Sequence, residues 1–122
     1  MDLSLLAVAA RLVVGLMFVV IGLRLLLGRS LVAALLATKR IPAPAFVALA
    51  GGVIEILLGL LMIAGVMPAY VAIAMAVFVV VATIMVHDFW HLKGQRRALE
   101  INTVLTHMLV VGGLLCMAAY PW

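Results

Sequence analysis

The embedded charges of this chain are its first candidates for chemistry. Glu55 lies in the middle of one apolar run and Arg11 lies inside another, and a charge in apolar surroundings is costly unless it has a partner. At helical spacing each shares a face with two glycines, which let helices approach closely: Gly15 and Gly22 beside Arg11, and Gly52 and Gly59 beside Glu55. We predict that these helices pack through the glycines and that Arg11 pairs with Glu55. Either the pair has a structural role, or Glu55 is a carboxylate that carries protons or binds a ligand.

A second polar group lies near the ends of two later apolar runs. Thr83, His87 and His91 follow one another at intervals of four residues, so on a helix they line one face. His107 lies in the next run, which is expected to be antiparallel, so it falls at a depth similar to that of Thr83. Arg24, near the end of the first apolar run, lies in the same layer. We therefore expect a polar cluster, which could line a cavity open to water.

Histidines on two helices offer several chemistries. They could relay protons near neutral pH, hydrogen-bond a quinone or ligate a haem axially, and of the two ligands we favour the quinone. The simpler alternative is that His87 and His91 anchor a helix end among lipid headgroups. We expect no intrinsic cofactor and no metal site. A di-iron bundle needs several embedded carboxylates, and in this chain only Glu55 is embedded. The chain has a single cysteine, Cys116, which excludes a thiolate metal site and a CxxC redox pair.

The composition excludes a soluble protein. Of the 122 residues 70% are apolar and 10% are charged, and the mean hydropathy is +1.45, whereas a soluble domain is roughly half apolar and a quarter charged. Disorder is excluded for the same reason. A helical span takes about 20 residues, so the chain has room for about four spans and for no soluble catalytic domain. We expect the protein to act in the bilayer or through a partner, and not to be catalytic alone.

Four apolar runs, at 4–27, 45–67, 69–90 and 101–120, predict four transmembrane helices. Backbone groups in hydrocarbon must form their hydrogen bonds within a helix. The short connections predict an all-α, antiparallel four-helix bundle, with residues 1–122 as a single membrane domain. The segment 29–44 is too short to span and is flanked by basic residues. It is predicted to form a short interfacial helix that Pro42 and Pro44 end.

The basic residues of this chain, whose net charge is +4, lie mostly in two of the connections. The residues concerned are Arg29, Lys39 and Arg40 in one, and Lys93, Arg96 and Arg97 in the other. The positive-inside rule makes loops 28–44 and 91–100 cytoplasmic, and places both termini on the other side of the cell inner (plasma) membrane. Orientation and contact with anionic lipid explain these charges, so no nucleic-acid partner is expected.

Several stretches of the chain resemble one family of small membrane proteins. The stretches are RLVVGLMFVVIGLRLLLG in the first run, IPAPAFVALAGGVIEILLGLLMIAG around the second, VATIMVHDFW at the end of the third and LTHMLVVGGLL in the fourth. They are similar to the four helices of the DoxX family, and the resemblance covers nearly the whole chain. In the fourth helix the family commonly has a Lys-Asn pair, where this chain has Thr106 and His107. A role that needs the lysine is therefore not expected here.

The resemblance implies a four-helix inner-membrane protein linked to quinone-dependent oxidation of sulfur compounds, or to redox complexes that assemble with soluble partners. Our first hypothesis is a small subunit of a redox complex, which anchors partners and contributes to a quinone pocket where Glu55, His87 or His107 delivers protons. One alternative is a structural or assembly subunit without chemistry of its own, and another is an oligomeric small-molecule carrier or channel. The expected partners are the lipid bilayer and other membrane or peripheral subunits, or further copies of the chain.

Overall fold

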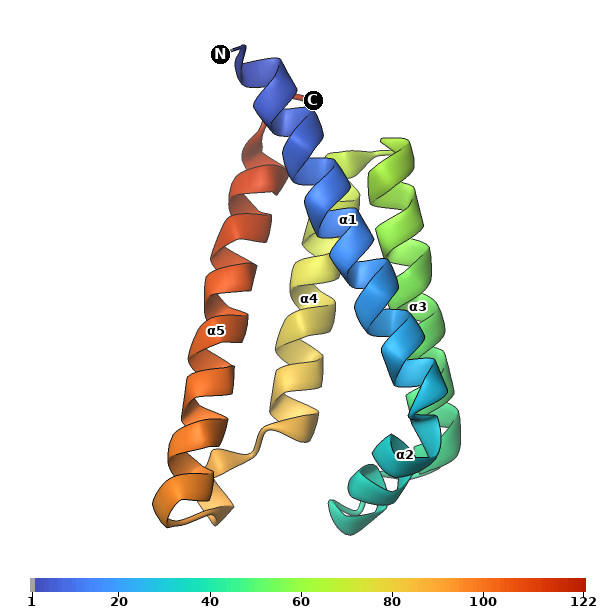
Figure 1. Cartoon of the computed structure of the whole chain (residues 1–122), viewed down its shortest axis with the longest axis vertical. Helices are drawn as coiled ribbons and strands as arrows, with labels where there is room; N and C mark the ends of the chain where they lie inside the picture. The colour runs from blue at the N-terminus through green and yellow to red at the C-terminus, as the bar shows by residue number, and fades with distance from the viewer. Residues whose placement is uncertain (1) are drawn as a thin grey trace.

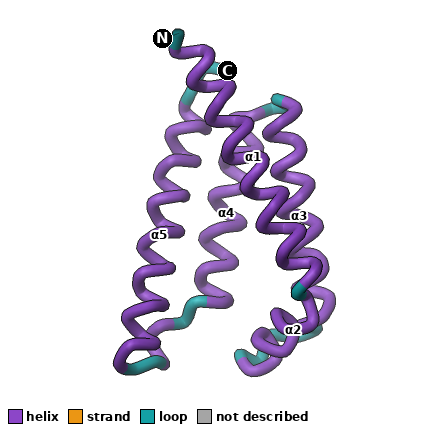
Figure 2. Tube along the Cα trace, in the orientation of Figure 1, coloured by secondary structure: helices purple, strands orange, loops and turns teal. Residues whose placement is uncertain are grey.

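The computed structural model describes residues 2–122, and within them the secondary structure is entirely helical (Figure 2). The elements are α1 (Leu3–Leu27), α2 (Arg29–Thr38), α3 (Pro44–Ala64), α4 (Pro68–Val86), the short 3₁₀ helix η1 (Phe89–His91) and α5 (Gly94–Ala119). Four of them, α1, α3, α4 and α5, are long and apolar enough to cross a membrane. The predicted four-helix membrane bundle is confirmed.

Local sequence signals explain where the helices begin and end. Asp2 caps α1 by accepting a hydrogen bond from the backbone N–H of Ser4 at 3.0 Å. Pro44 and Pro68 open α3 and α4 at the first helical position, where the missing N–H costs nothing. Gly65 ends α3 in the left-handed conformation, with φ +76°, which a residue without a Cβ adopts most easily.

The last span begins earlier than its apolar run. Helix α5 starts at Gly94, seven residues before the predicted start at 101, because the intervening GQRRALE is rich in good helix formers. Helix α4 ends at Val86, and the rest of the third run forms η1 and its flanking turns. Polar residues that we expected in a loop therefore lie on the first turns of α5.

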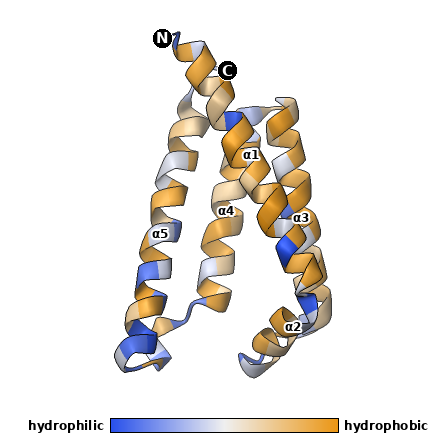
Figure 3. Cartoon of the chain, in the orientation of Figure 1, coloured by the Kyte–Doolittle hydropathy of each residue, from blue (hydrophilic) through white to orange (hydrophobic). Residues whose placement is uncertain are grey.

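The spans form two pairs, α1 with α3 and α4 with α5 (Figure 1). Both termini lie toward the end where a short turn joins α3 to α4. The opposite end holds α2 and η1, and we call it the basic end because residues 28–43 and 87–97 there carry six of the eight Lys and Arg residues. Figure 3 shows hydrophobic colour along the four long helices and hydrophilic colour gathered on the first turns of α5.

Glycines hold α1 and α3 together. A Cβ added at Gly15 would lie 2.7 Å from the carbonyl oxygen of Gly59, and one added at Gly22 would lie 2.9 Å from that of Gly52. Both distances are too short for a real side chain, so only glycine permits this backbone approach. The predicted packing of the first two spans through these four glycines is confirmed.

The four spans share one small core, and it lies away from the basic end. Its buried members are Phe18, Met62, Val71, Ala72, Met75, Ala76 and Leu114. Phe18 comes from α1 and the others from the end of α3, the start of α4 and the end of α5, so the two pairs pack together near the α3–α4 turn. Many other large apolar side chains are exposed, as expected for helices that face lipid.

Candidate functional site

The predicted ion pair between Arg11 and Glu55 is wrong. Arg11 instead donates two hydrogen bonds at 3.2 Å, from Nε to the carbonyl oxygen of Met62 and from Nη2 to that of Ile63. Its guanidinium also lies 5.9 Å from the ring centroid of Trp122. Arg11 thus binds the last turn of α3, where the carbonyl groups have no partner within the helix and the helix dipole is negative.

The register of α1 against α3 explains why Arg11 and Glu55 do not pair. Gly22, not Arg11, lies opposite Glu55, because a Cβ at Gly22 would be 3.1 Å from the Cβ of Glu55. Met62 is seven residues further along α3, a distance of about 10 Å. The sequence placed Arg11 and Glu55 at roughly compatible depths, but the carbonyl groups at the end of α3 lie closer to Arg11 and accept its hydrogen bonds.

Glu55 is the one buried ionisable residue among residues 2–122, with 8% of its surface exposed. Within those residues its carboxylate has no hydrogen-bond or ion-pair partner. It lies on the glycine face between α1 and α3, separate from the histidines. Glu55 therefore lies apart from the other candidate site residues.

The histidines form a cluster between α4 and α5, at the basic end. We call it the His87–His107 cluster, and it consists of Thr83, His87, Glu100 and His107. The Nδ1 atom of His87 lies 2.6 Å from Oε2 of Glu100, and the Nδ1 atom of His107 lies 2.8 Å from Oγ1 of Thr83. The two imidazole rings meet edge to face, with centroids 5.1 Å apart and planes at 77°.

The hydrogen bonds assign the protons of both rings. The hydroxyl of Thr83 donates its only proton to the carbonyl oxygen of Val79 at 2.6 Å, so it accepts from Nδ1–H of His107. A carboxylate accepts only, so His87 donates from its Nδ1–H to Glu100. With Nδ1 engaged in these hydrogen bonds, Nε2 is the remaining nitrogen of each ring and the atom that can take up or pass on a proton.

Burial increases along the cluster. The side chains of Glu100 and His87 are 33% and 22% exposed, whereas Thr83 is 5% exposed. The cluster therefore leads from the surface of the basic end toward the interior between α4 and α5. This arrangement suits proton uptake from water toward the membrane, because every member is hydrogen-bonded and its outer end is open.

Sequence reasoning missed Glu100, and two expected members lie elsewhere. Glu100 precedes His107 by seven residues, a spacing that puts both on one helix face, but we expected the last span to begin after it. Arg24 is exposed and does not join the cluster, because α1 packs on α3 rather than on α5. His91 is also exposed and lies on η1, outside the cluster.

An apolar groove lies deeper in the membrane than the cluster, between α4 and α5. Its volume is about 280 Å³. It is lined by Ala76, Val77, Val80, Val81, Val111 and Leu115. Val80 precedes Thr83 by three residues and Val111 follows His107 by four, so the groove begins one helical turn beyond the Thr83–His107 hydrogen bond. A flat apolar molecule in this groove would have its polar edge at the histidines.

Metal binding finds no support in the part of the chain that the structure describes. Residues 2–122 contain no group of three or more His, Cys, Asp or Glu side chains that could hold an ion. Cys116 is exposed.

Comparison with known proteins gives one result. The family model described as DoxX matches residues 6–88, which include α3, α4 and nearly all of α1. No curated protein and no solved structure matches the chain. The matched residues include Thr83 and His87, whereas Glu100 and His107 lie beyond them on α5.

Proposed function

The chain belongs to the DoxX family, and on that premise we propose that it is a small inner-membrane subunit of a redox complex. It anchors partner subunits and contributes a quinone site between α4 and α5, with the basic end on the cytoplasmic side. The observation that carries the proposal is the His87–His107 cluster, which leads from the surface to an apolar groove facing lipid.

The groove and the cluster fit a quinone. The groove walls are aliphatic and suit a ring with an isoprenoid tail, and its outer end holds hydrogen-bonding groups that suit a ring carbonyl. A bound quinone supplies an acceptor for electrons, which must come from a redox centre in a partner because no side chain of this chain carries them. This chain binds and orients the ring and provides the protons.

Proton delivery begins at the outer end of the cluster. Glu100, whose side chain is more exposed than that of His87, exchanges protons with water and accepts a hydrogen bond from His87. The rings of His87 and His107 are in direct edge-to-face contact, with centroids 5.1 Å apart. His107, which Thr83 holds through Nδ1, takes up a proton at Nε2 and, as the imidazolium, donates it from the same atom to the ligand.

Partner anchoring is assigned to α5, the least covered span. Leu114 is its one buried residue among those that the structure describes. Gly112 and Gly113 are exposed, and a Cβ added at either would meet nothing within 4 Å. Small residues allow a partner helix to approach closely, and such a helix would cover the groove from the lipid side.

The test is extraction of the protein from its own membrane in mild detergent, followed by native mass spectrometry and quinone analysis. We expect co-purifying subunits that carry a redox centre, together with bound quinone. In that complex His107→Gln should lower quinone reduction at least 100-fold, the lower end for a general acid. Glutamine can still hydrogen-bond Thr83, so the fold is kept.

His91→Gln is the matched control, because His91 lies outside the cluster and is exposed. It should leave quinone reduction unchanged. Recovery of the chain alone or as a homo-oligomer, with lipid but no quinone, contradicts the proposal. A redox complex whose activity is the same with His107→Gln and His91→Gln contradicts the proton-delivery role and favours a purely structural subunit.

A further inference from the structure

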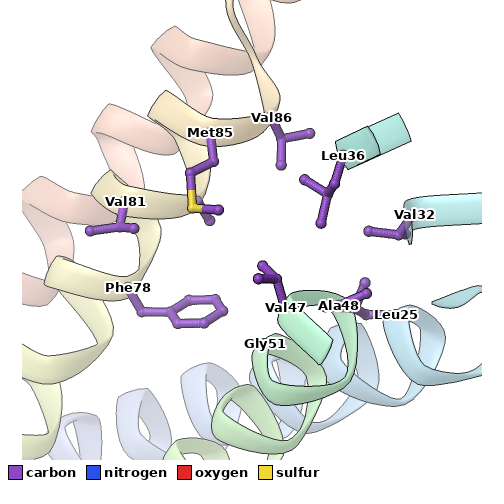
Figure 4. A pocket seen from close by; sticks show the side chains of 11 residues that line it. Leu25, Val32, Leu36, Val47, Ala48, Gly51, Phe78, Val81, Met85 and Val86 are labelled. Atoms are coloured by element: carbon purple, nitrogen blue, oxygen red, sulfur yellow. The ribbon is translucent and has the colours of Figure 1, made fainter. Parts of the chain in front are cut away.

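A second cavity lies on the neighbouring face of α4, and Val81 lines both this cavity and the groove of the quinone site proposed above. It is partly open and is bordered by the end of α1, by α2, by the start of α3 and by the end of α4, and its volume is about 140 Å³. Figure 4 shows Leu36 of α2, Val47 of α3, and Phe78 and Met85 of α4 pointing into it. All its lining residues are apolar, so it accepts an apolar group rather than a polar one.

A larger polar groove of about 560 Å³ lies beside this cavity, at the surface of the basic end. The two adjoin at α2 and just after α4: Leu36 and Val86 line the cavity, whereas Leu35 and Asp88, which is two residues beyond the end of α4, line the groove. An ion pair between Lys39 and Asp88 joins the end of α2 to the end of α4 there.

The groove is positively charged. Lys39 and Arg40 from the end of α2 and Arg96 from the start of α5 line it, with Asp88 as its one acidic residue. Three basic side chains against one carboxylate leave a surplus of two positive charges. Such a surplus beside an apolar cavity is complementary to a molecule with an anionic head and an apolar tail.

One of these basic residues, Arg40, has a strained backbone conformation. Arg40 has φ +60° and occupies the position after α2 where glycine is usual, with its N–H bonded to Ala37 and that of Ile41 bonded to Leu36. A glycine would adopt this conformation at lower cost. Strain of this kind is common at functional sites, and here it holds an arginine at the rim of the groove.

We propose that the groove and the cavity together bind one anionic phospholipid. Its phosphate lies against Arg40 and Arg96, near the Lys39–Asp88 pair, and a segment of one acyl chain fills the cavity. The cavity holds only part of a chain, so the remainder lies against the lipid-facing surface of the helices. The lipid thus joins the two helix pairs at the basic end, away from the core that they share.

The experiment measures lipid retained by the full-length protein. The protein is equilibrated with mixed phosphatidylglycerol and phosphatidylcholine micelles, and native mass spectrometry counts the lipids bound to each chain. We expect one tightly held phosphatidylglycerol. Arg96→Gln should weaken its retention about fivefold, which corresponds to about 1 kcal/mol for one basic residue near an anionic surface.

Arg97→Gln is the matched control, because it removes the same charge from the adjacent residue. Arg97 lies over the ring of Phe89, 6.0 Å from its centroid, and outside the groove. The Arg97→Gln variant should retain as much phosphatidylglycerol as the unmodified protein. Equal losses with Arg96→Gln and Arg97→Gln would show diffuse attraction to the surface and overturn the proposal.

Two further variants test the site without endangering the fold. Arg40→Gly relieves the backbone strain, so it should leave thermal stability unchanged or higher while weakening lipid retention about fivefold. Gly51→Leu extends a side chain into the cavity from a position whose Cβ meets only Leu25, at 3.6 Å, and it should also reduce retention. Full retention in the Gly51→Leu variant, or displacement of the lipid by millimolar inorganic phosphate alone, would overturn the proposal.

Discussion

A double-mutant cycle on Arg11 and Glu55 tests the register of α1 against α3. The variants are Arg11→Met, Glu55→Gln and the combination. Arg11 donates to Met62 and Ile63, and Met62 lies about 10 Å along α3 from Glu55. Residues this far apart without shared partners act independently, so the two effects should add to within about 0.5 kcal/mol.

The two single variants should differ in their free energy of unfolding. Arg11→Met removes two hydrogen bonds from a charged donor, each worth about 1.5 kcal/mol at the lower end of the range, so the free energy of unfolding should fall by about 3 kcal/mol. Glu55→Gln removes no hydrogen bond among residues 2–122 and places a neutral amide of the same shape at a site 8% exposed. It should leave the free energy of unfolding unchanged or raise it.

Reversible unfolding in mixed micelles of mild detergent and dodecyl sulfate, followed by helical circular dichroism, measures all four proteins. An ion pair would give a different pattern. Removing one partner of a buried pair costs about 3–5 kcal/mol, so Glu55→Gln would then be strongly destabilising. A coupling energy of 1 kcal/mol or more between the two sites would refute the register described here.

Two further predictions concern other contacts. Gly59→Ala should lower the free energy of unfolding by about 1–3 kcal/mol, because its Cβ would lie 2.6 Å from the carbonyl oxygen of Gly15. Gly51→Ala, whose Cβ meets an ordinary contact at 3.6 Å, should be neutral or stabilising in the same assay, and equal losses would contradict the glycine packing. Asp88→Asn breaks the ion pair with Lys39 and should cost no more than about 1 kcal/mol, yet speed tryptic cleavage after Arg40. Unchanged cleavage would show that the pair does not hold α2 in place.

The spans were predictable because lipid leaves the backbone few choices. A helix satisfies its own N–H and C=O groups, so a long apolar run is sufficient to specify one. The faces were predictable too, since helical periodicity alone places Gly15 and Gly22 on one side of α1 and Gly52 and Gly59 on one side of α3. The structure confirms that these faces meet.

The start of α5 shows a limit of the apolar pattern. Hydropathy marks where a helix enters hydrocarbon, but α5 continues for seven residues beyond its apolar run because those residues favour helix. Glu100 lies in that extension and hydrogen-bonds to His87. The i, i+7 spacing of Glu100 and His107 was readable in the sequence, yet it has meaning only once both residues lie on one helix.

The sequence by itself determined the number of spans, the glycine faces that pack, and the presence of histidines on two neighbouring helices. Only the tertiary structure decided which residues meet across those faces: Gly22 rather than Arg11 opposite Glu55, the carbonyl groups of α3 as partners of Arg11, and the exposure of Arg24. The reason is physical. Periodicity fixes the direction in which a side chain points, whereas the axial offset between two helices depends on all their contacts at once, including those of the connecting helix α2.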